Sequence, residues 1–434
     1  MKKRNRLILL TLFIVSLSLR LWKLGEIPQG LSLNEVGFGL SLSKYVGSWI
    51  LNPVFIRLPF VILGIASIYL VFLLIQKITD DFQLGFVSSF LLAITPWHIA
   101  QSRVYSPGMG VFFLVLLVPL FILRKRKFDL NKLVKFSVIV FLLTFIFSVF
   151  SIDPDIKYKV DEQRNIASMS EFNFLSRIFS NKIIESYRYR RKLLFENFDL
   201  GNYFFSGHPT ERWGVEEIPK LFVIFLPLMF AGMLTVSKKT KIIKQLIIIW
   251  IFLSLSVFIL FELRGPGETL PIVFPLIALV GLGLNHFSKK KGWFYKLTFL
   301  VVAFELMIFC AHYFSGLNES QFSPRCSVFE NLVQEVESNL KEGERVVVSQ
   351  RLKNPKPFFQ FYLNNIKLDD YEFRTFNIWD EEAGKFFVDV LPDGALPNET
   401  LYTDDGSWPG KLEFVGEHYD TQKRQTVFIY RKNI

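Results

Sequence analysis

The first group of residues suited to chemistry lies in the stretch Pro28–Gly39, shortly after the first apolar segment of the chain. Glu35 supplies a carboxylate there, and Leu33, Val36 and Phe38 are its close neighbours in sequence. Partial burial among apolar side chains makes a carboxylate a better proton acceptor, so Glu35 is a candidate general base. The alternative is a surface carboxylate that caps the N-terminus of an interfacial helix.

A second group occupies Thr95–Arg103, directly after another apolar segment. Arg103 is suited to hold a phosphate, because a guanidinium can donate two parallel hydrogen bonds to phosphate oxygens. His98 could donate to the same phosphate, and Trp97 offers an aromatic ring to a substrate. We predict that this stretch forms a turn between two membrane spans. The alternative interpretation is a belt of Trp, His and Arg at the membrane interface.

The third group, Phe198–Pro219, combines aromatic and polar side chains. Asn202, His208 and Arg212 supply hydrogen-bond donors and acceptors, while the neighbouring aromatic rings could stack on the C–H faces of a sugar. This composition favours substrate binding by these three residues. The alternative is a loop that packs against the bilayer.

Long apolar blocks separate these groups. The chain is 51% hydrophobic and contains 48 phenylalanines, and a spanning helix needs roughly 20 mostly apolar residues. We therefore predict an α-helical polytopic membrane protein with about nine transmembrane helices. The predicted spans are Leu7–Leu24, Val54–Gln76, Gln83–Thr95, Gly108–Leu123, Val134–Ser151, Leu221–Val236, Leu246–Phe261, Leu270–Leu284 and Leu297–Phe314.

Basic residues set the expected orientation. Lysines and arginines gather before the first predicted span and after the fourth, sixth and eighth, so all of these clusters fall on one face, as the positive-inside rule requires. We expect a multi-pass protein of the plasma (cytoplasmic) membrane with its N-terminus in the cytoplasm. The predicted domains are a transmembrane domain, 1–317, with outer loops 23–53 and 152–220, and an extracytoplasmic domain, 318–434.

The predicted extracytoplasmic domain has an α/β pattern. Apolar residues recur at helical spacing over Ser327–Leu340, whereas Arg345–Ser349 and Val427–Tyr430 are rich in residues that favour strands. We predict a small C-terminal α/β domain that is large enough to bury a core of its own.

The charge pattern favours lipid over nucleic acid as a partner. The net charge is +11, but the excess of positive charge belongs to the membrane half, because residues 318–434 are net acidic. Basic residues between spans fit cytoplasmic loops and contact with anionic lipid head groups. The two cysteines lack the spacing of a zinc site, and no glycine-rich phosphate loop occurs, so we expect neither a metal nor a cofactor.

Taken in order, these groups resemble the GT-C membrane glycosyltransferases of the protein O-mannosyltransferase type (glycosyltransferase family 39), including the bacterial lipid A aminoarabinose transferases. The resemblance covers roughly residues 7–290, and four stretches carry it. They are Arg20–Leu31 followed by Asn34 and Glu35, Pro96–Ile99 with Ser102 and Arg103, Asn202–His208 followed by Ile218 and Pro219, and Leu270–Pro275 with Gly281–Gly283.

The resemblance implies a reaction. The donor would be a polyprenyl-phosphate sugar, and the acceptor would be a glycan, lipid or protein on the outer face of the membrane. An acid of the first loop would take the proton of the acceptor while the lipid phosphate leaves. Arg103 would be placed to hold that phosphate, and the reaction needs no nucleotide or other cofactor.

The chain departs from the pattern of this family at its reacting positions. The first-loop motif usually contains an Asp-Glu pair, but this chain has Asn34 and Glu35, and an amide cannot act as a base. No acid follows Ser102-Arg103 within Val104–Gly108, where bacterial members often carry one. The chain also has fewer predicted spans than such enzymes usually have.

Three functions therefore compete. The first is a hexosyl or pentosyl transferase that uses Glu35 in place of the usual acid. The second is a catalytically inactive relative that binds lipid-linked glycan or a protein partner. The third is a transporter, which should show charged residues along a pathway at mid-membrane depth. Few ionisable residues lie within the apolar blocks, with Glu305 as the main exception, so transport ranks last.

Overall fold

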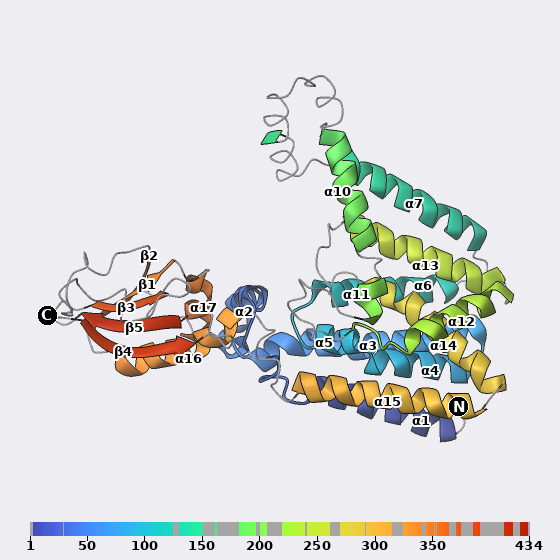
Figure 1. The fold of residues 1–434 in the computed structure, drawn as a ribbon, viewed down its shortest axis with the longest axis horizontal. Helices are drawn as coiled ribbons and strands as arrows, with labels where there is room; N and C mark the ends of the chain where they lie inside the picture. The colour runs from blue at the N-terminus through green and yellow to red at the C-terminus, as the bar shows by residue number, and fades with distance from the viewer. Residues whose placement is uncertain are drawn as a thin grey trace. The chain divides into compact units, whose positions relative to one another are not determined.

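The computed structural model is mainly helical and includes one β-sheet near the C-terminus (Figure 1). The structure describes residues 3–28, 30–124, 130–150, 161–162, 182–196, 200–205, 219–238, 241–260, 270–290, 292–314, 324–340, 344–350, 352, 354–363, 370–374, 385–390, 412–419 and 426–432. Its contacts divide the chain into two compact units. The helical unit comprises Met1–Leu19, Ile62–Ser102 and Ser106–Phe309, and the loop–sheet unit comprises Arg20–Val61, Arg103–Tyr105 and Cys310–Ile434.

Each of the nine apolar segments that the sequence predicts as spans overlaps a helix. These helices are α1 (Lys3–Leu21), α3 (Pro53–Thr79), α4 (Phe82–Ile94), α6 (Pro107–Arg124), α7 (Leu130–Phe150), α12 (Phe225–Lys238), α13 (Lys241–Leu260), α14 (Val273–Lys290) and α15 (Gly292–Phe314). Within the described residues, three segments are long and apolar enough to cross a membrane, namely Pro53–Thr79, Leu270–Phe287 and Gly292–Phe314. The number of crossings stays a prediction.

A sharp bend follows α4. The helix ends at Ile94, and α5 (Pro96–Ser102) begins at once, at an angle of 64°. Proline disfavours the helical conformation of the residue before it, and Thr95 accordingly has extended backbone angles of φ −63° and ψ 124°. The stretch Pro96–Ser102 is therefore a short helix whose seven residues are all buried, not the turn that the sequence predicts.

Helices α12 and α14 of the helical unit lie side by side (Figure 1). Their close approach runs through glycines. A Cβ on Gly283 of α14 would overlap the carbonyl oxygen of Leu228 in α12, and a Cβ on Gly232 of α12 would overlap that of Leu279 in α14. Only residues without side chains permit such an approach of two helix backbones, as in small-residue contacts between membrane helices. The late-span glycines of the sequence motif thus have a packing function.

Replacing Gly283 with alanine is expected to force α12 and α14 apart and to cost about 1–3 kcal/mol of stability, as overpacking does in a close-packed core. Thermal unfolding of the purified protein in detergent measures this cost. Gly110→Ala in α6 is the matched control, because no described atom lies within 4 Å of the added Cβ. Equal melting temperatures for the two variants would contradict the close contact.

The sheet of the loop–sheet unit has five strands in the order β2-β1-β3-β5-β4. Strand β1 pairs in parallel with β2 and β3, whereas β5 pairs antiparallel with β3 and β4. The strands are β1 (Arg345–Ser349), β2 (Tyr371–Arg374), β3 (Lys385–Val390), β4 (Leu412–Tyr419) and β5 (Thr426–Lys432). The two predicted strands correspond to β1 and to part of β5. The predicted helix overlaps α16 (Pro324–Asn339).

The core of this unit combines the sheet with the first loop of the chain. Apolar residues of α16, of α17 (Pro355–Tyr362) and of the strands pack with Leu31, Val36 and Ile56. Helix α2 (Leu33–Val46) contacts α17, and a Cβ on Gly39 would come within 3.0 Å of the Phe361 ring. The first loop is therefore part of the same folded core as the sheet. The predicted domain boundary at residue 317 lies outside the described residues.

Tyr371 gives this core a dependence on alkaline pH. Burial, together with the nearby Glu337 and Asp370, raises the pKa of Tyr371 to about 12. A free tyrosine has a pKa of about 10, so the unfolded chain ionises first, and stability should fall as the pH rises from about 10 to about 12. Tyr371→Phe should lose less stability over that interval than the parent protein. The free energy of unfolding of both proteins, measured below and above about pH 10, checks this. Identical losses of stability in Tyr371→Phe and the parent protein would contradict it.

Candidate active site at the first loop

Helix α2 begins with a capping box that fixes the position of Glu35. The backbone N–H of Glu35 donates to the Ser32 hydroxyl at 3.1 Å, and the backbone N–H of Ser32 donates to Glu35 Oε2 at 2.8 Å. The sequence spacing of Ser and Glu is that of this motif, which satisfies two N–H groups that a helix start leaves unpaired. Glu35 thus takes part in the cap of α2, whose N-cap residue is Ser32, but its side chain has no exposed surface, unlike the surface carboxylate of the alternative interpretation.

The second oxygen of Glu35 forms a buried ion pair. Arg57 of α3 donates from Nε to Glu35 Oε1 at 3.0 Å, and neither side chain is exposed. The other guanidinium nitrogens of Arg57 donate to the carbonyl oxygens of Leu24, at 2.9 Å, and Gly30, at 2.6 Å. A buried charge needs such partners, since an unpaired one costs several kcal/mol. The sequence interpretation missed Arg57, although an arginine within an apolar span is itself a signal of a specific role.

Arg103 binds other backbone carbonyl oxygens of the same loop. Its guanidinium donates to the carbonyl oxygens of Arg20 at 2.9 Å, Trp22 at 2.7 Å and Ile27 at 2.9 Å. Its side chain is buried, and its charge lies 5.0 Å from the centre of the Phe314 ring. Burial lowers the pKa of this guanidinium. In this structure Arg103 shapes the loop, and phosphate binding by Arg103 stays a prediction.

Asn34 is arranged differently from its neighbour. Its side chain is exposed on the first turn of α2, whereas that of Glu35 points into the core. The exposed group at the first turn of α2 is therefore the amide of Asn34, which can donate and accept hydrogen bonds but cannot act as a base. The carboxylate beside it already accepts hydrogen bonds at both of its oxygens.

Three aromatic rings gather in the same unit. The ring of Tyr105 lies 5.0 Å from that of Phe38 in α2 and 5.2 Å from that of Phe60 in α3, measured between centres. Phe38 and Tyr105 are only partly buried. The sequence analysis noted only the missing acid in this stretch. These rings offer an aromatic surface that the residue spacing alone does not reveal, because the contact joins three separate segments.

The remaining predicted residues belong to the helical unit. His98 is fully buried, and its Nε2 is 3.0 Å from the Ser67 hydroxyl. Trp97 is buried against Tyr203 at 5.5 Å between ring centres. The Lys220 ammonium lies 4.8 Å from the centre of the Trp97 ring, a cation–π contact that the sequence analysis missed.

These contacts tie α5 to two other segments, since the backbone N–H of Trp97 also donates to the Lys220 carbonyl oxygen at 3.2 Å. The third predicted group is only partly described. Asn202 lies in α11 (Leu200–Phe204). His208 and Arg212 lie outside the described residues. Their roles in substrate binding stay predictions.

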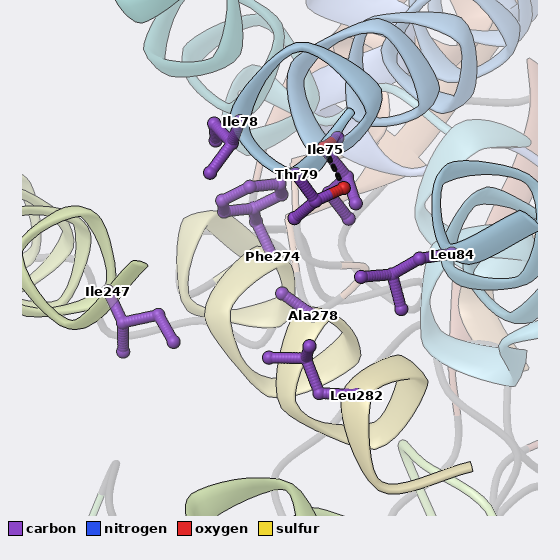
Figure 2. A pocket seen from close by; sticks show the side chains of 8 residues that line it. All are labelled: Ile75, Ile78, Thr79, Leu84, Ile247, Phe274, Ala278 and Leu282. Carbon is purple, nitrogen blue, oxygen red and sulfur yellow. Dashed lines mark hydrogen bonds between the residues drawn. The ribbon is translucent and has the colours of Figure 1, made fainter. Parts of the chain in front are cut away.

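Two cavities in the helical unit are apolar. The smaller, of about 40 Å³, is lined by Ile75, Ile78, Thr79, Leu84, Ile247, Phe274, Ala278 and Leu282 (Figure 2). Its one hydroxyl, on Thr79, already donates to the Ile75 carbonyl oxygen at 2.7 Å. The larger, of about 260 Å³, is lined mainly by Phe, Leu and Val between α4, α14 and α15. Such linings suit hydrocarbon better than a sugar.

Comparison with known proteins gave structural matches only. No protein-family model matches the chain, and no curated protein matches it. The chain is similar to the apo structure of ArnT from Cupriavidus metallidurans, with 11% identity, a TM-score of 0.43 and coverage of 98% of this chain and 97% of that one. It is also similar to the Archaeoglobus fulgidus oligosaccharyltransferase, with 12% identity and a TM-score of 0.36. That match covers 86% of this chain and 62% of the oligosaccharyltransferase chain. Both are GT-C glycosyltransferases.

Proposed function

We propose that this chain is a glycosyltransferase that moves a sugar from a polyprenyl-phosphate donor to a glycan, lipid or protein acceptor at the outer face of the plasma membrane. In this proposal the chain crosses the membrane nine times, with the N-terminus in the cytoplasm and the sheet outside. The observation that carries the proposal is the first turn of α2, where Asn34 is exposed on a loop held by two buried arginines.

The rigidity of this loop is what glycosyl transfer needs from it. Positioning the reacting groups can supply a large part of a rate enhancement, provided that their geometry is fixed. The capping box and the bond from Arg57 to Glu35 fix the start of α2, and Arg103 fixes the segment that leads to it. The partly exposed rings of Phe38 and Tyr105 add an aromatic surface of the kind that sugars bind.

The reaction can then be written without a protein base. A bond forms from the acceptor oxygen to the anomeric carbon, while the bond from that carbon to the lipid phosphate oxygen breaks. The Asn34 amide oxygen accepts a hydrogen bond from the acceptor hydroxyl and orients it. The proton passes to the departing phosphate or to water, since Glu35 is already bound at both oxygens. Such a reaction is slow compared with one that has a base.

A second candidate function is binding without transfer. The specific observation that favours it is the combination of an exposed amide at position 34 with a carboxylate at position 35 that is buried and ion-paired. A relative that has lost its base could still bind lipid-linked glycan or a protein partner. Transfer and the binding of lipid-linked glycan require the same donor to bind and differ only in turnover, whereas the binding of a protein partner needs no donor.

The test uses the full chain reconstituted in liposomes with radiolabelled polyprenyl-phosphate hexose or pentose. We expect slow transfer by the parent protein and a clear loss of transfer in Asn34→Ala, whose exposed position should leave the fold intact. Glu26→Gln, in an exposed part of the same loop, is the matched control. Donor binding without transfer would establish the second candidate. Absence of both donor binding and transfer would contradict transfer and the binding of lipid-linked glycan.

A further inference from the structure

Large apolar side chains are exposed at the end of α2 and at the start of α3. Tyr45 is 89% exposed, Val46 46% and Trp49 59%, and the exposed Val54 and Phe55 follow in the first turn of α3. We call these five residues the loop patch. Isolated apolar residues on a surface need no explanation, but large apolar side chains exposed together in one short stretch of the chain indicate an interaction site.

The loop patch is an ordered structure. The indole Nε1–H of Trp49, in the short helix η1 (Ser48–Ile50), donates to the Val46 carbonyl oxygen at 3.0 Å. Its ring meets that of Phe55 edge-on, at 5.2 Å and 88°. Gly47 makes this arrangement possible, because its φ of 109° is a backbone angle that other residues rarely adopt. The rings are thus held in place while one face stays uncovered.

Chain continuity indicates what covers the loop patch. Val54 and Phe55 belong to α3, which is one of the helices long and apolar enough to cross a membrane, and a span that begins at Pro53 would turn their exposed sides towards lipid. Only three residues separate Trp49 from the first residue of α3. Tyr and Trp are enriched at membrane–water interfaces, where an apolar ring and a polar group can both be satisfied. The exposed Lys44 beside them fits contact with lipid phosphates.

We infer that the loop patch lies in the interfacial layer of the leaflet that α3 enters at Pro53. The patch then anchors the C-terminal end of α2 to the bilayer surface, while Arg57 and the sheet core hold its N-terminal end. This anchoring holds whether or not the chain transfers sugar. It keeps the exposed Asn34 on a helix that is fixed at both ends.

The test places a single cysteine at chosen positions of the full chain after Cys310→Ala and Cys326→Ala substitution. The variants Tyr45→Cys and Trp49→Cys probe the loop patch. Leu300→Cys, 67% exposed on α15, is the lipid control, and Gln334→Cys, on the exposed side of α16, is the water control. Each cysteine carries an environment-sensitive fluorophore, and the protein is reconstituted in vesicles of phosphatidylcholine and phosphatidylglycerol.

We expect the fluorophores at positions 45 and 49 to be quenched several-fold more by spin-labelled lipids than by aqueous iodide. The lipid control at position 300 should behave in the same way, whereas the water control at position 334 should be quenched more by iodide. Quenching by iodide alone would overturn the inference, because the patch would then lie in water. Protection from both quenchers would also overturn it, since a protein, such as a second copy of the chain, would then cover the patch. Quenching of the fluorophores at 45 and 49 by spin-labelled lipids to the same extent as at position 300 supports the inference.

Discussion

Replacing Arg57 with alanine is expected to lower the stability of the loop–sheet unit by about 3–5 kcal/mol, the usual cost of removing one partner from a buried ion pair. The substitution leaves the Glu35 carboxylate buried without its counterion, because neither side chain has exposed surface. It also removes the donors to the carbonyl oxygens of Leu24 and Gly30. Thermal and denaturant unfolding of the purified protein in detergent measures the effect.

The matched control for this experiment is Glu26→Gln. Glu26 pairs with Lys23 at 3.2 Å in the same loop, but the two side chains are 71% and 49% exposed. An exposed pair contributes at most about 1 kcal/mol, so this variant should unfold almost as the parent does. The double variant Glu35→Leu and Arg57→Leu should recover part of the loss, because it leaves no unpaired charge in the core. An Arg57→Ala protein as stable as Glu26→Gln would refute the structural role of the pair.

The helices were predictable because apolar segments of spanning length are a local property of the chain. A run of about 20 apolar residues is visible without any partner, and each predicted span overlaps a helix. The capping box was also within reach, since Ser32 and Glu35 lie three residues apart in the spacing that this motif requires. The bend at Thr95 could have been read from Pro96, because proline restricts the residue before it.

The pairing of Glu35 with Arg57 was not predictable from spacing. The two residues are 22 positions apart, in different helices, and only the folded loop brings them together. The same limit applies to Arg103, whose three acceptors lie more than 70 residues away and are backbone carbonyl oxygens, which every residue has. Sequence reasoning could assign these side chains a charge and a hydrogen-bonding capacity, but it could not assign their partners.

The shared core of α2 and the sheet was hidden for a related reason. The sequence predicts residues 318–434 as a separate domain, because nothing local links Phe361 to Gly39. Contact between two apolar faces far apart in sequence leaves no mark on the composition of either segment. The consequence for function is that the helix carrying Asn34 depends on the C-terminal part of the chain for its support.

Asn34→Asp is expected to raise the rate of sugar transfer by about 100-fold to 10,000-fold, which is the typical contribution of a positioned general base. The side chain is exposed on the first turn of α2, so the new carboxylate needs no rearrangement of the core. A negative charge at the N-terminus of a helix is also favourable, so the fold should be retained. The radiolabel assay in liposomes measures the rate, and unfolding in detergent confirms that stability is unchanged.

The pH dependence of the transfer rate distinguishes two explanations for a faster Asn34→Asp variant, namely a new general base and an indirect effect of the added charge. A free aspartate has a pKa of about 4, so the faster reaction should fall away as the pH drops towards that value, whereas the parent rate should show no such limb. Gln334→Glu makes the same change from amide to acid on the exposed side of α16 and should leave the rate unchanged. A rate for Asn34→Asp no higher than that of Gln334→Glu would show that more than a base is missing from the first loop. The chain would then be a protein that binds its ligand without transferring it, and the loop held by Arg57 and Arg103 would serve binding alone.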